Sequence, residues 1–171
     1  GGLVHITRGA RGLARNEGEL AGVLAHEITH VTHKHTVNAI RKNKAVQIGT
    51  NETLSGRAPF LDKLANKAYE MVLENGFNRD DELDADRTAV ALVQKAGYAP
   101  VALGDFLTRL EDRNKDQAEK NGLFASHPET KERIAKIRQL SASAKSAALV
   151  AARYKSQVKY EAASLTAIAT D

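Results

Sequence analysis

The feature that most constrains the fold is an amphipathic pattern that begins at Asn16 and predicts a long helix. Asn16 can cap this helix, and Glu19 stands three residues later, as in a capping box. Apolar residues then recur at spacings of three and four through Ile28, Val31 and Ile40. This spacing is typical of a helix with one buried face. We therefore expect one stripe of this helix to pack against a core.

Two histidines and a glutamate fall inside the same helix. His26 and His30 are four residues apart, so at about 100° per residue their side chains lie about 40° apart on one face. Both imidazoles can therefore reach one metal ion. Glu27 is offset by about 100°, where its carboxylate can act on a water without binding the metal. Two surface histidines paired by accident are the alternative, but the spacing favours a zinc hydrolase.

A catalytic zinc takes three protein ligands and keeps one position open. A third histidine six residues after His30 is missing, because Thr36 stands there. In the predicted helix after Asn78, Glu82 and Asp86 are four residues apart and share a face. Glu82 can bind zinc, and Asp86 can accept the hydrogen bond from the second ring nitrogen of a ligating histidine.

Two alternatives to this third ligand stay open. The acidic residues Glu82, Asp84 and Asp86 could form a solvated first turn that is favourable at a helix N-terminus. Glu70 and Glu74 are also four residues apart and are the rival ligand pair. We favour Glu82 with Asp86 as its neighbour.

Composition restricts the classes of protein further. Apolar residues make up 42% of the 171-residue chain and charged residues 27%, as in globular domains. The chain has no cysteine, so any metal must be held by His, Asp or Glu. No apolar run approaches the roughly 20 residues of a membrane span, so we expect no transmembrane segment. A net charge of +4 and the basic region 131–159 offer little support for nucleic-acid binding, and we expect no nucleic-acid partner.

The rest of the pattern predicts short helices and one strand. Residues 3–7 read as a strand between glycines, and its edge could align an extended substrate. We expect a loop at 43–59, helices at 60–74, 79–95, 100–113 and 128–140, and a weakly packed Ala-rich helix in the tail 144–169. The chain starts at Gly1 without Met or a signal-peptide pattern, so we expect a processed product or part of a longer protein.

These motifs together resemble the HtpX-like and CAAX-prenyl-endopeptidase family of gluzincin zinc metallopeptidases, and in particular its bacterial envelope members. The matching segments, in chain order, are GGLVHITRG (1–9), EGELAGVLAHEITHV (17–31), NRDDELDAD (78–86), GYAP (97–100) and SHPETKERI (126–134). The combination spans roughly residues 1–140 and is more specific than the histidine motif alone.

The resemblance implies one Zn²⁺ per chain, bound by His26, His30 and Glu82, with Glu27 as catalytic base and Asp86 as supporting carboxylate. It implies an α+β, predominantly α-helical zincin-type domain with a small β element before the active-site helix. We assign this catalytic domain to residues 1–140, lacking an upstream portion that the family normally has, and an Ala-rich helical C-terminal extension to 141–171.

The resemblance also singles out His127, which matches the family's His-Pro position. His127 could donate a hydrogen bond to the oxyanion or occupy the open zinc position in a latent form; a histidine that caps its helix is the alternative. We expect His33 to lie at the rim of the site, His35 to point away from it as a structural residue, and His5 to have no role.

The predicted activity is zinc-dependent hydrolysis of internal peptide bonds, as a metalloendopeptidase of unfolded or misassembled polypeptides. The alternative is a latent zinc-binding domain that acts as a chaperone or assembly factor. The resemblance implies a location in the bacterial periplasm or cell envelope, as a soluble protein with envelope proteins as partners.

Overall fold

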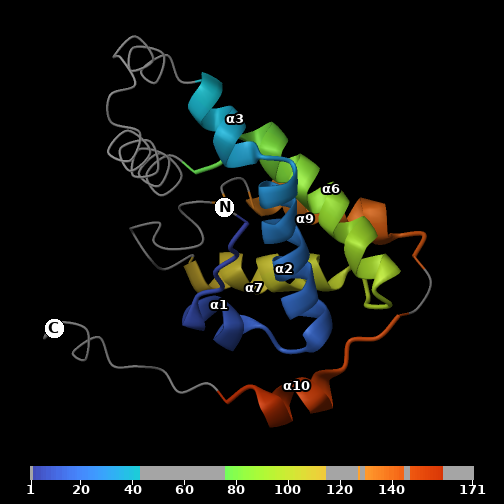
Figure 1. Ribbon diagram of the computed structural model, residues 1–171. Coiled ribbons are helices and arrows are strands. Elements are labelled where there is room, and N and C mark those ends of the chain that lie inside the picture. The colour runs from blue at the N-terminus through green and yellow to red at the C-terminus, as the bar shows by residue number, and fades with distance from the viewer. Residues whose placement is uncertain (1, 43–75, 115–126, 128–129, 145–146, 160–171) are drawn as a thin grey trace, which may run out of the picture.

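The computed structural model describes residues 2–42, 76–114, 127, 130–144 and 147–159. Figure 1 shows α2 in the middle of the molecule, crossed by α7 and flanked by α6, with α10 along the lower edge. The described helices are α1 (Arg8–Leu13), α2 (Glu17–Thr32), α3 (His35–Lys42), α6 (Arg79–Lys95), α7 (Ala102–Asn114), α9 (Thr130–Ser141) and α10 (Ala151–Gln157). The expectation of a predominantly helical domain is confirmed.

The strand predicted at residues 3–7 is wrong. These residues have extended or irregular backbone, and in the described part of the chain no strand runs beside them. A β-strand needs a hydrogen-bonded neighbour, so β-branched composition alone does not create one here. The described residues contain a single isolated parallel bridge, between Tyr98 and Ala148. The proposal of a substrate-aligning edge at residues 3–7 therefore loses its basis.

Helix α2 begins as its sequence predicts. The Asn16 side chain accepts a hydrogen bond from the Glu19 amide at 2.9 Å, and the Glu19 carboxylate accepts from the Arg15 amide at 2.8 Å. Two amides at the start of the helix are thereby satisfied. Arg109 of α7 also donates to the Glu19 carboxylate, so the cap ties α2 to α7.

The same helix ends earlier than predicted. The expected continuation to Ile40 is interrupted at Lys34, whose φ of 58° places it in the left-handed region and turns the chain into α3. The buried face of α2 is also rotated, because Ile28 and Val31 are exposed while His26 and His30 are buried. His26 and His30 thus lie on the buried face of α2, where the apolar spacing predicts Ile28 and Val31.

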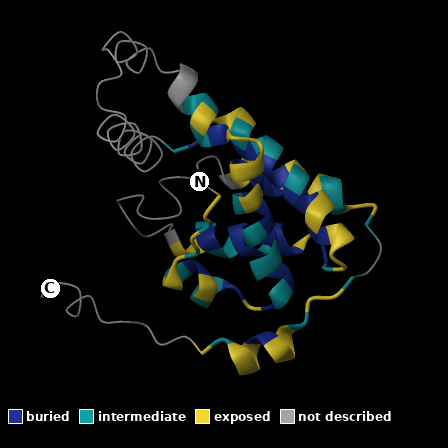
Figure 2. Ribbon diagram, in the orientation of Figure 1, coloured by how far each residue is buried: buried dark blue, intermediate teal, exposed yellow. Residues whose placement is uncertain are grey.

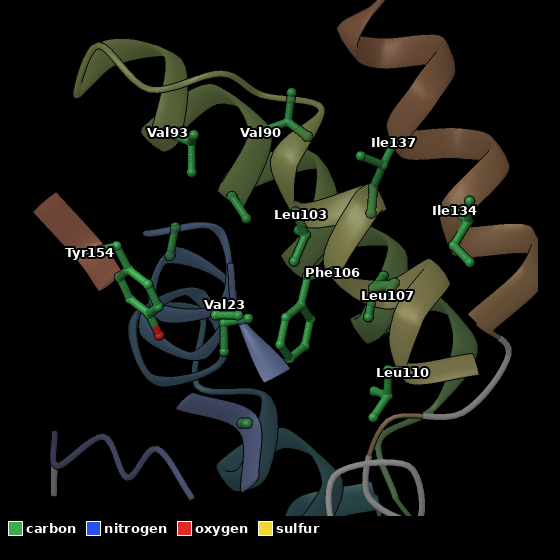
Figure 3. Packing of buried hydrophobic residues seen from close by; sticks show 14 residues of the cluster. Val23, Val90, Val93, Leu103, Phe106, Leu107, Leu110, Ile134, Ile137 and Tyr154 are labelled. Atoms are coloured by element: carbon green, nitrogen blue, oxygen red, sulfur yellow. The ribbon is translucent and has the colours of Figure 1, made fainter. Parts of the chain in front are cut away.

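The core lies where α7 packs between α2 and α9. Gly22 of α2 makes this close approach, since a Cβ there would lie 2.9 Å from Cβ of Leu103. Phe106 is fully buried beside Val23, and Ile137 of α9 is buried on the other side of α7 (Figure 3). Figure 2 shows the buried residues on the faces that these helices turn toward one another. Apolar burial here fixes α2 and α9 relative to each other.

Helix α6 has the predicted boundaries. The Asn78 side chain accepts from the Asp81 amide at 2.9 Å, and the chain leaves the helix through Gly97, whose φ is 83°. Pro100 precedes α7 by two residues instead of opening it. The predicted loop at 43–59 and helix at 60–74 lie outside the described residues.

The tail differs from its prediction. Its described helix, α10, is short, and it packs on the core through Tyr154, which is 5% exposed and donates a hydrogen bond to the backbone oxygen of Arg11 at 2.6 Å. Tyr154, together with the ion pair between Arg153 and Glu17, therefore holds a segment that its sparse apolar spacing predicted would pack weakly. None of the described helices combines the length and the hydropathy that a membrane span requires.

Candidate metal centre

Two helices and one residue outside the helices bring four potential metal ligands together. His26 and His30 come from α2, Glu82 comes from the first turn of α6, and His127 precedes α9. All four side chains are buried, and their ligand atoms lie within 4.8 Å of one another. The caps Asn16 and Asn78 fix where α2 and α6 begin, and the packing of these two helices on each other brings the ligands together.

The separations between these ligand atoms suit a tetrahedral ion. Nε2 of His26 lies 3.0 Å from Nε2 of His30 and 3.2 Å from Nδ1 of His127. Oε1 of Glu82 lies 3.4 Å from His30 Nε2 and 2.8 Å from His127 Nδ1. Ligands held about 2.0–2.1 Å from a tetrahedral zinc are about 3.3 Å apart. The four side chains therefore form a cage of the right size for such an ion.

Asp86 fixes the tautomer of His26. Its Oδ1 lies 2.9 Å from Nδ1 of His26, so that nitrogen donates its proton to the carboxylate and Nε2 keeps its lone pair toward the cluster. Asp86 is fully buried on α6, one turn after Glu82. The structure thus places Asp86 behind His26, where the sequence spacing predicted a supporting carboxylate.

The electrostatics of the cluster favour a cation. Burial lowers the pKa of His30 to about 4, which keeps its imidazole neutral and able to bind metal. Burial also opposes charge on Glu82, but hydrogen bonds from His127, His26 and His30 outweigh it and hold the pKa of Glu82 below its usual value. Burial and Arg133 oppose charge on His26, yet the carboxylates of Asp86 and Glu82 raise its pKa. A positive charge beside these carboxylates is therefore stabilised.

Glu27 lies at the edge of this cluster. Its Oε1 is 3.4 Å from Nε2 of His127, and its side chain is 20% exposed, whereas the Glu82 side chain is 1% exposed. Glu27 is not among the four converging ligands. The helical offset that separated Glu27 from His26 in the sequence thus leaves its carboxylate beside the cluster and in contact with solvent.

The pocket beside Glu27 is apolar. Leu103, Phe106, Leu107 and Leu110 of α7 supply its walls, and His26, Glu27 and His127 line its polar side. Apolar pockets with a few polar groups at one edge are typical of substrate sites. The cluster of potential ligands therefore borders an apolar pocket.

Arg133 is a site residue that our sequence analysis missed. Its buried guanidinium donates two hydrogen bonds to Asp86, at 2.7 and 2.8 Å, and its Nη1 lies 2.6 Å from Oε2 of Glu82. The signal was present, because Arg133 precedes the inward-facing Ile137 by one helical turn. A charged residue on the apolar face of a helix indicates a buried partner.

Two further histidines lie nearer than their spacing suggested. His35, expected to point away, is buried with Nδ1 3.0 Å from Nδ1 of His30, because the turn at Lys34 folds α3 back toward α2. His33 lies at the rim, as expected, and its Nδ1 pairs with Asp84 of α6. Phe77 stacks on the His30 ring with centroids 3.8 Å apart and shields it from solvent.

The donor set fits a divalent metal. Neutral imidazoles and a carboxylate are the ligands that zinc takes in hydrolases without cysteine. Oε2 of Glu82 is buried and has no well-aligned hydrogen bond within the described residues, despite the nearby Arg133. A divalent cation together with Arg133 would balance the three carboxylates of Glu27, Glu82 and Asp86. The residues present therefore suit a metal ion in charge as well as in spacing.

We predict that Arg133→Met destabilises the chelator-treated protein by about 3–5 kcal/mol, because it leaves the buried carboxylate of Asp86 without its cation. Urea unfolding followed by circular dichroism measures the difference. Arg138→Met, an exposed arginine on the same helix, is the control and should change the free energy of unfolding by less than about 0.5 kcal/mol. Equal stability of the two variants would show that Arg133 does not compensate the buried carboxylates.

Comparison with known proteins places this cluster in a family. The profile of peptidase family M48 matches residues 1–141. The putative β-barrel assembly-enhancing protease of Vibrio cholerae serotype O1 is 30% identical over 148 residues, which cover 81% of this chain and 31% of that protein. The metalloprotease YcaL of Escherichia coli strain K12 is 28% identical over 149 residues, covering 84% and 57% of the two chains.

A third relative bears on the resemblance found in the motifs. The protease HtpX homolog of Acidiphilium cryptum is 27% identical over 176 residues, covering 81% of this chain and 60% of that protein. The chain spans less than a third of the Vibrio relative and more than half of the other two. The resemblance to HtpX-like metallopeptidases is confirmed, and the chain belongs to peptidase family M48, a family of metallopeptidases.

Proposed function

We propose that this chain is a zinc-dependent metalloendopeptidase that hydrolyses internal peptide bonds, with one Zn²⁺ held by His26, His30 and Glu82. The observation that carries the proposal is the convergence of both histidines and Glu82 from two helices far apart in sequence: Nε2 of His30 lies 3.0 Å from Nε2 of His26 and 3.4 Å from Oε1 of Glu82, and Nε2 of His26 lies 3.5 Å from Oε2 of Glu82. Membership of a metallopeptidase family supports it. When bound, the zinc supplies Lewis-acid polarisation of the scissile carbonyl and acidifies a water molecule.

Glu27 is the proposed general base. Its carboxylate lies beside the ligand cluster but outside it, and it is partly exposed, so a water molecule can reach it. It takes a proton from the attacking water and passes this proton to the leaving amine. One carboxylate thereby serves both steps of the hydrolysis.

Asp86 and Arg133 are proposed to position the ligands and to take no part in the chemistry. Oδ1 of Asp86 lies 2.9 Å from Nδ1 of His26 and accepts its hydrogen bond. The proton is thereby kept on Nδ1, and Nε2, the ligand nitrogen, carries none. Arg133 clamps Asp86 with two hydrogen bonds, so this carboxylate cannot rotate away from His26. A positioned ligand loses less entropy when the metal binds.

The substrate is proposed to be a polypeptide with an apolar side chain next to the scissile bond. The pocket beside Glu27 is walled by four apolar residues of α7, so it favours such a side chain over a charged one. Unfolded or misassembled proteins expose apolar side chains, which folded ones bury. Proteins of the bacterial envelope are the proposed substrates and partners and the periplasm the proposed location, since one relative is named as a β-barrel assembly-enhancing protease.

We predict that Glu27→Gln lowers kcat for an unstructured polypeptide by about 10²–10⁴-fold, because the amide cannot accept the proton. Gel electrophoresis of the substrate over time measures cleavage, and metal analysis should find unchanged zinc content, because Glu27 is not a ligand. Glu17→Gln at the start of the same helix is the control and should retain activity. Undiminished turnover by Glu27→Gln would refute its role as base.

A second candidate function is a latent zinc domain that acts as a chaperone or assembly factor. The observation in its favour is the position of His127, whose Nδ1 lies 2.8 Å from Oε1 of Glu82 and 3.2 Å from Nε2 of His26. His127 thus stands at the fourth corner of the cage, where a hydrolase keeps an open position. In this form His26, His30, Glu82 and His127 would together hold the ion and would leave no position for a water molecule.

We predict that His127→Ala raises peptidase turnover and weakens zinc binding, because it opens the fourth corner and removes one ligand atom. Proteolysis assays and zinc competition with a chromophoric chelator measure the two effects. His5→Ala is the control, since this exposed histidine lies outside the cluster of potential ligands. A drop in turnover with unchanged zinc affinity would instead assign His127 to the oxyanion.

A further inference from the structure

Beside the cluster already described, the structure gathers a second set of potential metal ligands. His33, His35 and Asp84 each offer one ligand atom, and these three atoms lie within 4.8 Å of one another. The turn at Lys34 brings the two histidines together, and Asp84 reaches them from α6. His33 and Asp84 are partly exposed while His35 is buried, so the set is open to solvent on one side.

The contacts within this set concentrate on one oxygen. Oδ2 of Asp84 pairs with Nδ1 of His33 and lies 3.4 Å from Nε2 of His35, so both imidazoles face the same carboxylate oxygen. The other oxygen of Asp84 accepts a hydrogen bond from Arg87. Two imidazoles and a carboxylate are donors that suit zinc, and the exposed side leaves room for water as a further ligand.

His35 links this set to the first cluster through its other nitrogen. Nδ1 of His35 lies 3.0 Å from Nδ1 of His30, so one of these two nitrogens donates a hydrogen bond to the other. His30 can bind a metal through Nε2 in the first cluster only when its proton is on Nδ1, and Nδ1 of His35 then accepts the hydrogen bond. The proton position on His35 is thereby coupled to metal binding by His30.

A metal on Nε2 of His35 requires the opposite proton position on this ring. Neutral His35 would then carry its proton on Nδ1, where it faces Nδ1 of His30. The hydrogen bond survives only if His30 moves its own proton to Nε2, and that nitrogen then cannot bind an ion in the first cluster. Keeping both ions costs the hydrogen bond between the two rings.

We propose that His33, His35 and Asp84 form a second, weaker divalent-metal site whose occupancy opposes metal binding at the first cluster. The site is weaker because it offers three ligands of which two are partly exposed, whereas four buried ones meet in the first cluster. The opposition is reciprocal, since coupling between two binding sites acts equally in both directions. The proposal rests on the proposed function only in treating the first cluster as a metal centre.

Zn²⁺ alone is the probe for the test. Equilibrium dialysis against a series of free Zn²⁺ concentrations, followed by metal analysis, gives the binding isotherm of the full chain. The wild type should bind one tight and one weaker zinc. His33→Asn should lose the weaker one, and His5→Asn, another exposed histidine, should keep both. A second zinc that survives in His33→Asn, or a wild type with only one zinc, would overturn the proposal.

His26→Gln tests the opposition between the sites. It removes a ligand from the first cluster and leaves the hydrogen bond between His30 and His35 in place. Its remaining zinc should bind more tightly than the second zinc of the wild type, by roughly the 5- to 150-fold typical of coupled sites. Equal affinity would overturn the opposition. These isotherms require no hydrolysis, so they stay informative even if the chain proves not to cleave peptides.

Discussion

The structure depends on the burial of two carboxylates, Glu82 and Asp86, in the first turns of α6. A charged group away from water is costly unless opposite charge and hydrogen bonds surround it. Here Arg133 contacts both carboxylates, while His26 lies against Asp86 on one side and Glu82 on the other. The packing of α2, α6 and α9 is what brings these partners together, and His127 adds a further donor to Glu82. The apolar core around Phe106 and Ile137 therefore holds in place the helices that carry this charged cluster.

Much of the site was predictable from the sequence because helical geometry is regular. The four-residue spacing of His26 and His30, and of Glu82 and Asp86, fixes each pair on one helix face whatever the rest of the chain does. The caps at Asn16 and Asn78 follow from local hydrogen bonding and were predicted correctly. The motifs also placed the chain in its family, which the comparisons confirm.

The remaining features depend on contacts between distant segments, which spacing does not report. His35 reaches His30 because Lys34 adopts a left-handed conformation, which is uncommon for a lysine and is not predicted by the residues around it. Residues 3–7 have strand-like composition, but strand formation requires a neighbour. The apolar pattern of α2 predicts Ile28 as a core residue, but Ile28 is exposed, and His26 and His30 lie on the buried face of the helix.

The central claim is that Glu82 of α6 completes a metal centre with the two histidines of α2. The most direct measurement is the zinc content of the purified chain after dialysis against zinc-free buffer, compared between Glu82→Ala and Glu70→Ala. Glu70 belongs to the rival pair in the sequence and lies outside the described residues. One tightly bound zinc is expected in the wild type and in Glu70→Ala, and its loss is expected in Glu82→Ala. Zinc retained by Glu82→Ala and lost from Glu70→Ala would contradict this claim.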